Sequence, residues 1–295
     1  MNFPAGVTVI IPTRDRPAAL RRCISALSES RHPNFEVIVA DQSDCDCSAD
    51  VVAAVGDPRV RYRRLHTKGK AKALNAAIAD ASHELLALVD DDIEVTPSWL
   101  ADGTTLMTNN SQVALIFGAV RAAQHDPRET YIPEFLPHKQ EILTSRTALR
   151  LPGTGMGANA FVRRSEVCAV GGWNESLGPG SFGRSGDDWD LAYRLLRRRR
   201  AVLVTPRLEV RHAGARQYAD GSARRLIENN YHGVGVGLGC YIKRGDLGAA
   251  MALARAVIAS ATTIAWRAAT GRRPTGLRAL AALTVGFRKS WEGQL

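Results

Sequence analysis

Three consecutive acids, Asp90, Asp91 and Asp92, are the residues whose type and spacing most clearly allow chemistry. They follow the apolar run 85–89, which is typical of a strand buried on both faces of a mostly parallel sheet. Carboxylates this close repel one another, so a cation or cationic side chains must neutralise them. Oxygen ligands suit Mg²⁺ or Mn²⁺, especially where phosphate oxygens complete the coordination shell. Because alternate residues of an extended segment point the same way, Asp90 and Asp92 are the candidate metal ligands.

The same acids also fit a simpler interpretation, a solvated turn before a helix that begins near Pro97. A second acidic group, Asp187, Asp188 and Asp190, stands at the start of another expected helix. An aspartate is a common N-cap, but capping explains only one of these three acids. His212 ends a late strand, where a lone histidine is more often a satisfied polar residue than a ligand.

The elements that position these residues alternate between strand and helix. Strands are expected at 7–11, 36–40, 60–65, 85–89, 113–120, 161–162, 201–205 and 209–212, and helices at about 17–27, 71–81, 97–107 and 191–196. This alternation predicts right-handed βαβ crossovers, and hence an α/β fold with a doubly wound, mostly parallel sheet flanked by helices. In such sheets ligands bind at the carboxyl edge of the strands, where the first acidic cluster falls.

Other residues of the right chemistry fall near this edge. Asp41 ends the second strand, where an acid accepts hydrogen bonds from a base or a ribose. The basic turn 68–70 opens a helix whose N-terminus attracts phosphate, and Lys72 and Asn75 are expected on or near its face toward the strand edge. The glycine-rich segment 153–160 lets the backbone approach a ligand closely.

Composition adds a charge asymmetry. With 295 residues, 45% of them apolar, the chain is long enough for one large α/β domain or a domain with an appendage. Residues 197–295 carry 18 Lys and Arg against 5 Asp and Glu, a net charge of +13 in a chain whose total is +10. Such an asymmetry indicates an anionic partner, either a nucleic acid or an anionic membrane surface.

The five cysteines and the N-terminus bear on the compartment. No disulfide framework is evident in their spacing, and no secretory signal precedes the first strand. We therefore expect a reducing cytosol, with Cys45 and Cys47 as two loop thiols.

The tail, residues 221–295, is expected to form a helical, basic extension. Its segment 247–269 is apolar but contains Arg255 and Arg267, which leave eleven uncharged residues between them, too few to span a bilayer. We therefore expect an interfacial helix on an anionic membrane, with Arg272 and other basic residues nearby. The alternative is a set of helices packed on the preceding domain with a solvated basic face.

Seven segments of the chain share an order with a known family. They are VTVIIPTRDRP, EVIVADQSD, GKAKALNAAI, LLALVDDDIEV, GANAFVRRSEVCAVGGWNE, GDDWDLAYRLLRR and PRLEVRHAG. Over about residues 5–215 the sequence resembles the family 2 glycosyltransferases of the GT-A fold. The resemblance implies an inverting, hexosyltransferase-type transfer of a sugar from a nucleotide-diphosphate sugar to an acceptor hydroxyl. It implies a role in cell-surface glycan, polysaccharide or glycolipid synthesis, with a glycan or lipid-linked acceptor and no nucleic acid.

The resemblance also implies roles for individual residues. Asp188 matches the catalytic base, and Asp90, Asp92 and His212 match the ligands of Mg²⁺ or Mn²⁺. The residues expected to bind the nucleotide sugar are Pro12, Thr13, Arg14, Asp15, Asp41, Lys72, Asn75, Asp90 and Asp91. The residues expected to face the acceptor are Trp173, Asp187 and Trp189, although an aromatic such as Trp173 also fits the core. The family's Asp-Asp-Gly-Ser after the second strand is replaced by Asp-Gln-Ser-Asp.

The implied division of the chain is a catalytic domain at 1–220 followed by the extension at 221–295. The nucleotide-sugar half of the domain is expected at about 1–120 and the acceptor half at about 150–220. A cytoplasmic protein, peripheral on the inner face of the cell membrane, fits this arrangement.

Three other functions remain open at this point. A sugar-phosphate nucleotidyltransferase would share the sheet and the acids, but normally has a glycine-rich loop where this chain has the segment 12–15. A nicotinamide-binding protein would explain the alternating glycines of 233–239, but these follow a helical stretch rather than a strand. A non-catalytic nucleotide-sugar-binding protein would not need Asp188 in addition to the metal-binding acids.

Overall fold

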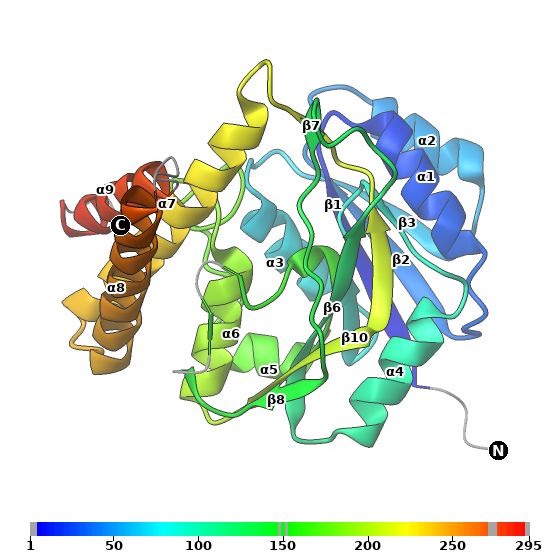
Figure 1. Ribbon diagram of the computed structural model, residues 1–295. Coiled ribbons are helices and arrows are strands. Elements are labelled where there is room, and N and C mark those ends of the chain that lie inside the picture. The colour runs from blue at the N-terminus through cyan, green and yellow to red at the C-terminus, as the bar shows by residue number, and fades with distance from the viewer. Residues whose placement is uncertain (1–4, 147–148, 151–152, 271–275, 293–295) are drawn as a thin grey trace.

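The computed structural model describes residues 5–146, 149–150, 153–270 and 276–292, and its centre is one mixed β-sheet with helices on both faces (Figure 1). The strands of this sheet are β1 (Val7–Thr13), β2 (Phe35–Asp41), β3 (Val60–Arg64), β4 (Leu85–Leu88), β5 (Ile93–Glu94), β6 (Val113–Ala122), β8 (Glu141–Leu143), β9 (Ala160–Arg163) and β10 (Ala201–His212). The helices are α1 (Pro17–Ser28), α2 (Cys47–Val55), α3 (Lys70–Asp80), α4 (Trp99–Asn109), α5 (Arg164–Ala169), α6 (Asp187–Arg197), α7 (Ser222–Lys243), α8 (Leu247–Ala269) and α9 (Leu277–Trp291). Two short strands, β7 (Thr130–Tyr131) and β11 (Arg216–Gln217), pair with each other apart from the sheet.

The strands lie in the order β3-β2-β1-β4-β9-β6-β10-β5, with β8 also paired to β10. The first four are parallel, as is the β6–β10 pair, whereas β9 runs antiparallel to both of its neighbours. This arrangement confirms the predicted mostly parallel sheet flanked by helices.

Two hydrophobic layers hold the helices on the sheet. Alternate residues of a strand face opposite sides, so in β1 the side chains of Val9 and Ile11 join one layer and that of Ile10 joins the other. The first layer packs against α1, α2 and α4, and the second against α3, α5 and α6. Solvent is excluded from both layers where they meet β1, since Val9, Ile10 and Ile11 are all fully buried.

Some elements differ from expectation. The two short strands expected at 201–205 and 209–212 form the single strand β10, with an irregular register against β6 between Thr205 and Glu209. Helix α2 lies in a segment for which we expected only a loop. At its start Cys45 and Cys47, expected to be two thiols, are joined by a disulfide.

Helices α7 and α9 pack closely against each other at glycine residues. Gly235 and Gly239 on α7 face α9, and a Cβ at Gly235 would lie only 2.2 Å from the carbonyl oxygen of Leu283. A Cβ at Gly286 on α9 would likewise lie 2.1 Å from the carbonyl oxygen of His232. The alternating glycines therefore lie inside a helix, where they let two backbones touch, and the nicotinamide-binding interpretation of 233–239 is wrong.

Helix α8 is long, apolar and largely exposed. Among the described residues it contains the one stretch that is long and apolar enough to cross a membrane, Leu247–Trp266, with a mean hydropathy of 1.6 and 12% of the stretch buried. From the sequence we expected this segment to be too short to span a membrane, because Arg255 and Arg267 interrupt it. Only Arg255 falls within these 20 residues. Length and composition alone thus do not separate a surface helix from a spanning one.

We predict that Gly235→Ala destabilises the protein although alanine is the better helix former. The gain of about 1 kcal/mol in helix propensity is outweighed by the collision with the Leu283 backbone, which can be relieved only by moving α9. We expect a net loss of about 1–3 kcal/mol in the free energy of unfolding, measured by urea titration of the helical circular dichroism signal.

Gly237→Ala is the matched control, because a Cβ there would lie 3.5 Å from the Trp189 ring, an ordinary contact. We expect Gly237→Ala to be neutral or stabilising by up to about 1 kcal/mol. Equal effects of the two substitutions would contradict close α7–α9 packing as the role of Gly235.

Candidate active site

The three acids lie where β4 ends, and the pairing of β5 with β10 brings His212 beside them. Ile93 of β5 is opposite His212 in the antiparallel pair, so the preceding residue, Asp92, lies next to the imidazole. The Nε2 of His212 is 3.3 Å from Oδ1 of Asp92, and its Nδ1 is 3.0 Å from the carbonyl oxygen of Pro133. A side chain at Gly214 would collide with Asp92, so a glycine is needed where the chain leaves β10.

Cationic side chains from two other parts of the chain neutralise the acids. Arg16, just before α1, places Nη1 3.1 Å from Oδ1 of Asp91 and 3.0 Å from Oδ2 of Asp92. Lys70, the first residue of α3, places Nζ 2.6 Å from Oδ1 of Asp90. The hydroxyl of Thr13 donates to Asp91 at 2.7 Å. The electrostatic repulsion expected from the sequence is therefore balanced by protein cations.

These contacts give neighbouring acids different acidities. Burial raises the pKa of Asp91 to about 6, against the opposing effect of Arg16. Burial also acts to raise the pKa of Asp92, but the hydrogen bond and charge of His212, together with Arg16, lower it to about 2. Burial lowers the pKa of His212, but its hydrogen bond to Asp92 and the charge of that acid hold the pKa above its ordinary value.

The second acidic group opens α6. Gly186 takes a left-handed conformation, with φ of 89°, and the helix then begins with Asp187 and Asp188. The backbone N–H of Gly157 donates to Oδ2 of Asp188 at 2.7 Å, and a Cβ at Gly157 would lie 2.2 Å from the other carboxylate oxygen. The glycine-rich segment therefore serves to bring backbone against Asp188, rather than directly against a ligand.

Lys70 links the two acidic groups. Its side chain is 16% exposed, and burial alone would lower its pKa. The surrounding carboxylates outweigh burial and hold the pKa of Lys70 above its ordinary value; they are those of Asp90, Asp188 and Asp187. Burial also raises the pKa values of Asp187 and Asp188, and mutual repulsion adds to the increase for Asp187. Oδ2 of Asp187 is buried without a hydrogen-bond partner.

A cleft of about 390 Å³ joins most of these groups. Its lining consists of Pro12, Thr13, Arg14, Arg16, Gln42, Gly69, Lys70, Asp90, Asp91, Asp92, Pro133, Met156, Pro179, Gly180, His212, Arg216 and Leu226. The cleft thus brings together expected site residues from the loop after β1, from the acidic cluster and from the end of β10. Asp188 is not part of this lining, but its partner Gly157 directly follows the lining residue Met156.

Other residues expected to contact the donor do not line the cleft. Asp41 is fully buried, and its carboxylate accepts hydrogen bonds from the N–H and hydroxyl of Ser43 and from the hydroxyl of Tyr62. Asn75 is bonded to the backbone of Trp173 at 2.7 and 2.9 Å, which ties α3 to the loop before α6. Lys72 is also outside the lining. Asp15, half exposed, pairs with Arg14, which does line the cleft.

The residues expected to face the acceptor are mostly buried. Trp173 is 2% exposed and packs in the layer under α3 and α6, so the structure favours the core interpretation of this side chain. Trp189 is 5% exposed and packs with Tyr193 against the C-terminal helices. Asp187 is also buried. In this structure neither tryptophan presents a ring face for a sugar to stack on.

Among the charged and amide side chains of the cleft, Arg16, Gln42 and Arg216 were not expected from the sequence, and Lys70 was expected only as part of the basic turn 68–70. Gln42 replaces the family's second acid, and its amide bonds the carbonyls of Thr67 and Gly69 and the N–H of Gly69. The need for a cation beside three acids was a usable signal for Arg16 and Lys70. No comparable signal marked Gln42 or Arg216.

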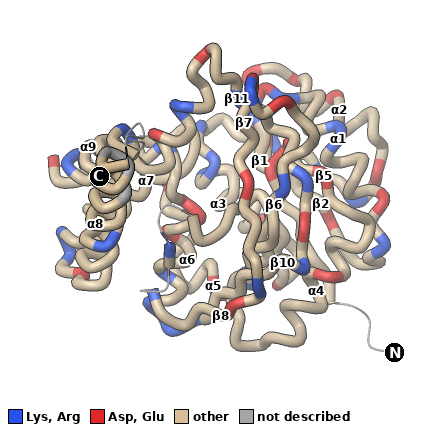
Figure 2. Tube along the Cα trace, viewed as in Figure 1, with Lys and Arg blue, Asp and Glu red and all other residues tan. Residues whose placement is uncertain are grey.

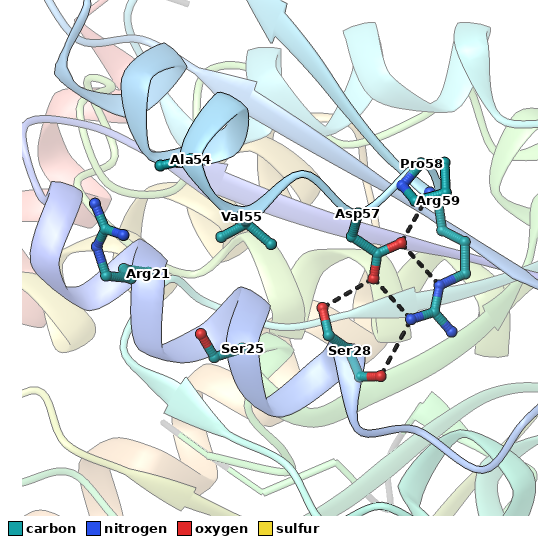
Figure 3. A pocket seen from close by; sticks show the side chains of 8 residues that line it. All are labelled: Arg21, Ser25, Ser28, Ala54, Val55, Asp57, Pro58 and Arg59. Carbon is teal, nitrogen blue, oxygen red and sulfur yellow. Dashed lines mark hydrogen bonds and ion pairs between the residues drawn. The ribbon is translucent and has the colours of Figure 1, made fainter.

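A second hollow, of about 750 Å³, lies between α1 and α2 (Figure 3). Its one carboxylate, Asp57, accepts hydrogen bonds from Arg59 at 2.7 and 2.9 Å and from the hydroxyl of Ser28 at 2.9 Å (Figure 3). The hydrogen bond from Arg59 lowers the pKa of Asp57 well below its ordinary value, in spite of burial. This carboxylate is engaged in fixing the turn before β3, so the cleft at the acids is the better candidate for chemistry.

Comparison with known proteins identifies the family of this chain. The model of the family described as Glycosyl transferase family 2 matches residues 8–167, more than half of the chain. Pre-mycofactocin glycosyltransferase of Mycobacterium tuberculosis is 27% identical over 229 residues, which cover 75% of this chain and 45% of that protein. Beta-monoglucosyldiacylglycerol synthase of Nostoc sp. is 25% identical over 200 residues, which cover 64% of this chain and 41% of that protein. The chain thus spans about half the length of the curated relatives it matches.

Solved structures share the fold. The mannosyltransferase PcManGT from Pyrobaculum calidifontis, in complex with GDP-Man and Mn²⁺, superposes with a TM-score of 0.67 at 18% identity, covering 99% of this chain and 89% of that one. S. aureus TarS 1-349, in complex with UDP-GlcNAc, superposes with a TM-score of 0.60 at 16% identity, covering 79% of this chain and 65% of that one. At these identities the similarity establishes the GT-A fold alone.

Proposed function

This chain belongs to glycosyl transferase family 2, and from that membership we propose that it transfers a hexose from a nucleotide-diphosphate sugar to an acceptor hydroxyl with inversion. The observation that carries the proposal is the cleft lined by three acids and their cationic partners, with Asp188 held behind its wall by the N–H of Gly157, the residue after the lining residue Met156. The named relatives and neighbours, which act in glycolipid synthesis or hold GDP-Man or UDP-GlcNAc, support a role in glycolipid or polysaccharide synthesis.

The cleft suits a diphosphate leaving group. Arg14, Arg16, Lys70 and Arg216 all line it, and guanidinium groups match phosphate oxygens through paired hydrogen bonds. Arg16 and Lys70 are already held by Asp90, Asp91 and Asp92, so their positions do not depend on the ligand. Preorganised charge of this kind lowers the barrier to breaking the bond between sugar and diphosphate.

A divalent cation fits the residues at one side of the cleft. Among the described residues no three acidic, imidazole or thiol side chains converge as a ready metal site. Asp92 and His212 are nevertheless adjacent, and if Nε2 gives up the proton that it shares with Asp92 while Nδ1 donates to Pro133, the Nε2 lone pair would be available to a metal ion. We propose that Asp92 and His212, with Asp90, hold Mg²⁺ or Mn²⁺, which when bound would stabilise the negative charge of the leaving diphosphate.

Asp188 is the proposed general base. Its carboxylate would accept the proton of the acceptor hydroxyl while that oxygen bonds to the anomeric carbon and the nucleoside diphosphate departs. Attack opposite to the leaving group in one displacement inverts the anomeric centre. Burial raises the pKa of this base; the charge of Lys70 and the N–H of Gly157 act to lower the pKa, and the charge of Asp90 acts to raise it.

The remaining expected contacts, from Asp41, Lys72, Asn75 and Trp173, require side-chain movement to reach a ligand in the cleft. A nucleotidyltransferase or a binding protein would use the same acids without Asp188. Turnover that depends on Asp188 separates the glycosyltransferase from both, so this residue decides the assignment.

The C-terminal helices supply a surface for a lipid-linked acceptor. Large apolar side chains are exposed along α8 and α9: Leu247, Met251, Val257, Ile258, Trp266, Leu277, Val285 and Trp291. Lys and Arg residues accompany them on both helices (Figure 2). Arg272 and Arg273 lie outside the described residues. We propose that residues 221–295 dock a cytoplasmic enzyme on the anionic inner face of the membrane, with α8 lying in the interface.

We predict that the donor binds only with Mg²⁺ or Mn²⁺. Arg16 and Lys70 are already paired with the acids, so Arg14 and Arg216 leave part of the charge of the diphosphate to be neutralised by an additional cation. Calorimetry with a panel of nucleotide sugars should show at least about tenfold weaker binding in excess chelator, and His212→Ala should show the same loss with metal present. Equal affinity with and without chelator would count against the metal site.

We predict that Asp188→Asn lowers turnover about a hundredfold or more while donor affinity is nearly unchanged. Because burial raises the pKa of Asp188, activity of the unmodified enzyme should fall as pH decreases through that raised value, where the base becomes protonated. Asp187→Asn is the matched comparison at the adjacent position. If Asp187→Asn abolishes turnover and Asp188→Asn does not, the base is misassigned.

We predict that the protein sediments with anionic vesicles and that salt weakens the binding without abolishing it. Electrostatic attraction is screened over about 10 Å at 0.1 M salt, whereas burial of apolar side chains is not. Ile258→Glu on α8 should release the protein, and Ile142→Glu, at an exposed isoleucine on β8 outside the C-terminal helices, should not. Vesicle binding that resists alkaline carbonate extraction would show instead that α8 spans the bilayer.

A further inference from the structure

A pocket of about 420 Å³ lies between α6 and α7, apart from the cleft. The loop 170–177 forms one wall, and the other walls come from the middle and end of α6 and the C-terminal half of α7. Three arginines, Arg194, Arg197 and Arg244, line it, together with a single acid, Asp190. Nothing in the glycosyltransferase proposal uses these residues.

Arg194 is rigidly held but incompletely bonded. Its Nε donates to Oδ2 of Asp190 at 2.7 Å, and its Nη1 donates to the carbonyl oxygens of Val170 and Gly172 at 2.8 and 2.7 Å. Its Nη2 is buried and has no hydrogen-bond partner. A buried donor without an acceptor is costly and uncommon, and at the wall of a pocket it indicates an acceptor that is supplied by a ligand.

The charges around the pocket do not balance. Asp190 is already satisfied by Arg194 and by the hydroxyl of Tyr241. Asp246, at the start of α8, lies between Arg197 and Arg146, at 3.4 and 3.5 Å.

Arg244, the residue that follows α7, has no ion-pair partner in the part of the chain that the structure describes. The lining of the pocket therefore contains one carboxylate, that of Asp190, and three arginines, Arg194, Arg197 and Arg244. The local excess of two positive charges matches a phosphate dianion.

The walls of the pocket leave room for such a group. Gly171 and Gly172 both take left-handed conformations, with φ of 86° and 77°, and a Cβ at Gly171 would meet nothing within 4 Å. Gly237 contributes the opposite wall. Asn174 adds a polar side chain, whose Oδ1 accepts the N–H of Ser176 at 3.1 Å. The loop 170–177 thus contributes glycine backbone and the polar side chain of Asn174 to the same pocket that the arginines line.

We propose that this pocket binds a phosphate group, with Arg194, Arg197 and Arg244 as donors. Guanidinium groups bind phosphate through paired hydrogen bonds, which is the geometry that the arginine forks provide. The phosphate belongs either to a lipid headgroup or to a small soluble molecule, since Arg244 is followed within three residues by exposed Leu247 of α8. The pocket is separate from the cleft, so the proposal stands independently of the proposed glycosyltransferase activity.

The first experiment titrates the full-length protein with inorganic phosphate in calorimetry, in chelator to suppress metal-dependent binding in the cleft. Arg244→Gln removes an exposed pocket arginine without breaking an ion pair. Asn174→Asp keeps the acceptor for Ser176 but adds a negative charge to the pocket. Each variant should weaken phosphate binding by about tenfold or more, because each removes or opposes one charge-assisted contact.

Two controls locate the binding. Arg278→Gln removes the same charge from an exposed position on α9 and should leave the affinity unchanged. Arg216→Gln alters the cleft without removing a salt-bridge partner of its buried acids and should also leave the affinity unchanged. The proposal is overturned if phosphate does not bind at millimolar concentration, or if it binds with the same affinity to both pocket variants as to the unmodified protein.

Vesicles distinguish the two sources of phosphate. If a headgroup is the ligand, binding to vesicles of phosphatidic acid in phosphatidylcholine should drop in Arg244→Gln but not in Arg278→Gln, and free phosphate should compete. If a soluble molecule is the ligand, free phosphate should bind through Arg244 while vesicle binding is the same in both variants. Either result supports a phosphate pocket and identifies its source.

Discussion

The structure depends on the neutralisation of three carboxylates at the end of one buried strand. Asp91 and Asp92 are nearly inaccessible to water, and an unpaired charge at such a depth costs several kcal/mol. The balancing groups come from three distant places in the sequence: Arg16 before α1, Lys70 at the start of α3 and His212 at the end of β10. The electrostatic requirement therefore fixes how these three regions approach β4. It also leaves the cleft close to neutral, which is why an anionic donor requires further positive charge from Arg14, Arg216 or a metal ion.

The register of β10 against β6 and β5 places His212 beside the acids. β10 runs parallel to β6 and then continues past an irregularity at Thr205–Glu209, far enough for its last residues to pair with β5. Since β5 begins directly after the acids, one antiparallel contact between Ile93 and His212 is sufficient to bring the imidazole to Asp92. A shift of one residue would turn His212 to the opposite face. On the other side, Gly157 is required because any side chain there would displace the carboxylate of Asp188.

Much of this was predictable from the sequence, and the exceptions have identifiable causes. Apolar runs and helical spacing located the strands and most helices, and the acids and His212 followed from their place at strand ends. The choice between Lys70 and Lys72 was not predictable, because it depends on where α3 begins, and residues two positions apart at a helix start are separated by about 200° and so point to opposite sides. The buried hydrogen bonds of Asp41 join it to Ser43, two residues on, and to Tyr62 on the neighbouring strand β3, and no local pattern reveals the contact with Tyr62. Trp173 was ambiguous because a turn aromatic has the same local pattern whether it packs inward or faces a ligand.

Helix α6 carries the proposed base, Asp188, and also packs against the C-terminal helices. Asp188 at its start is held beside the cleft by Gly157, whereas Asp190, Arg194 and Arg197 line the arginine pocket, and the two linings share no residue. The far side of α6 is covered by α7 and α8 through Trp189, Tyr193 and Tyr241, and Tyr241 bonds directly to Asp190. Glycines in α7 bring α9 against the same layer, so the position of α6 depends on packing that extends to the end of the described chain. Because a hydrogen bond of 2.7 Å to Gly157 tolerates little displacement of Asp188, the C-terminal helices act on the proposed base by holding α6 in place, whatever they bind at their outer surface.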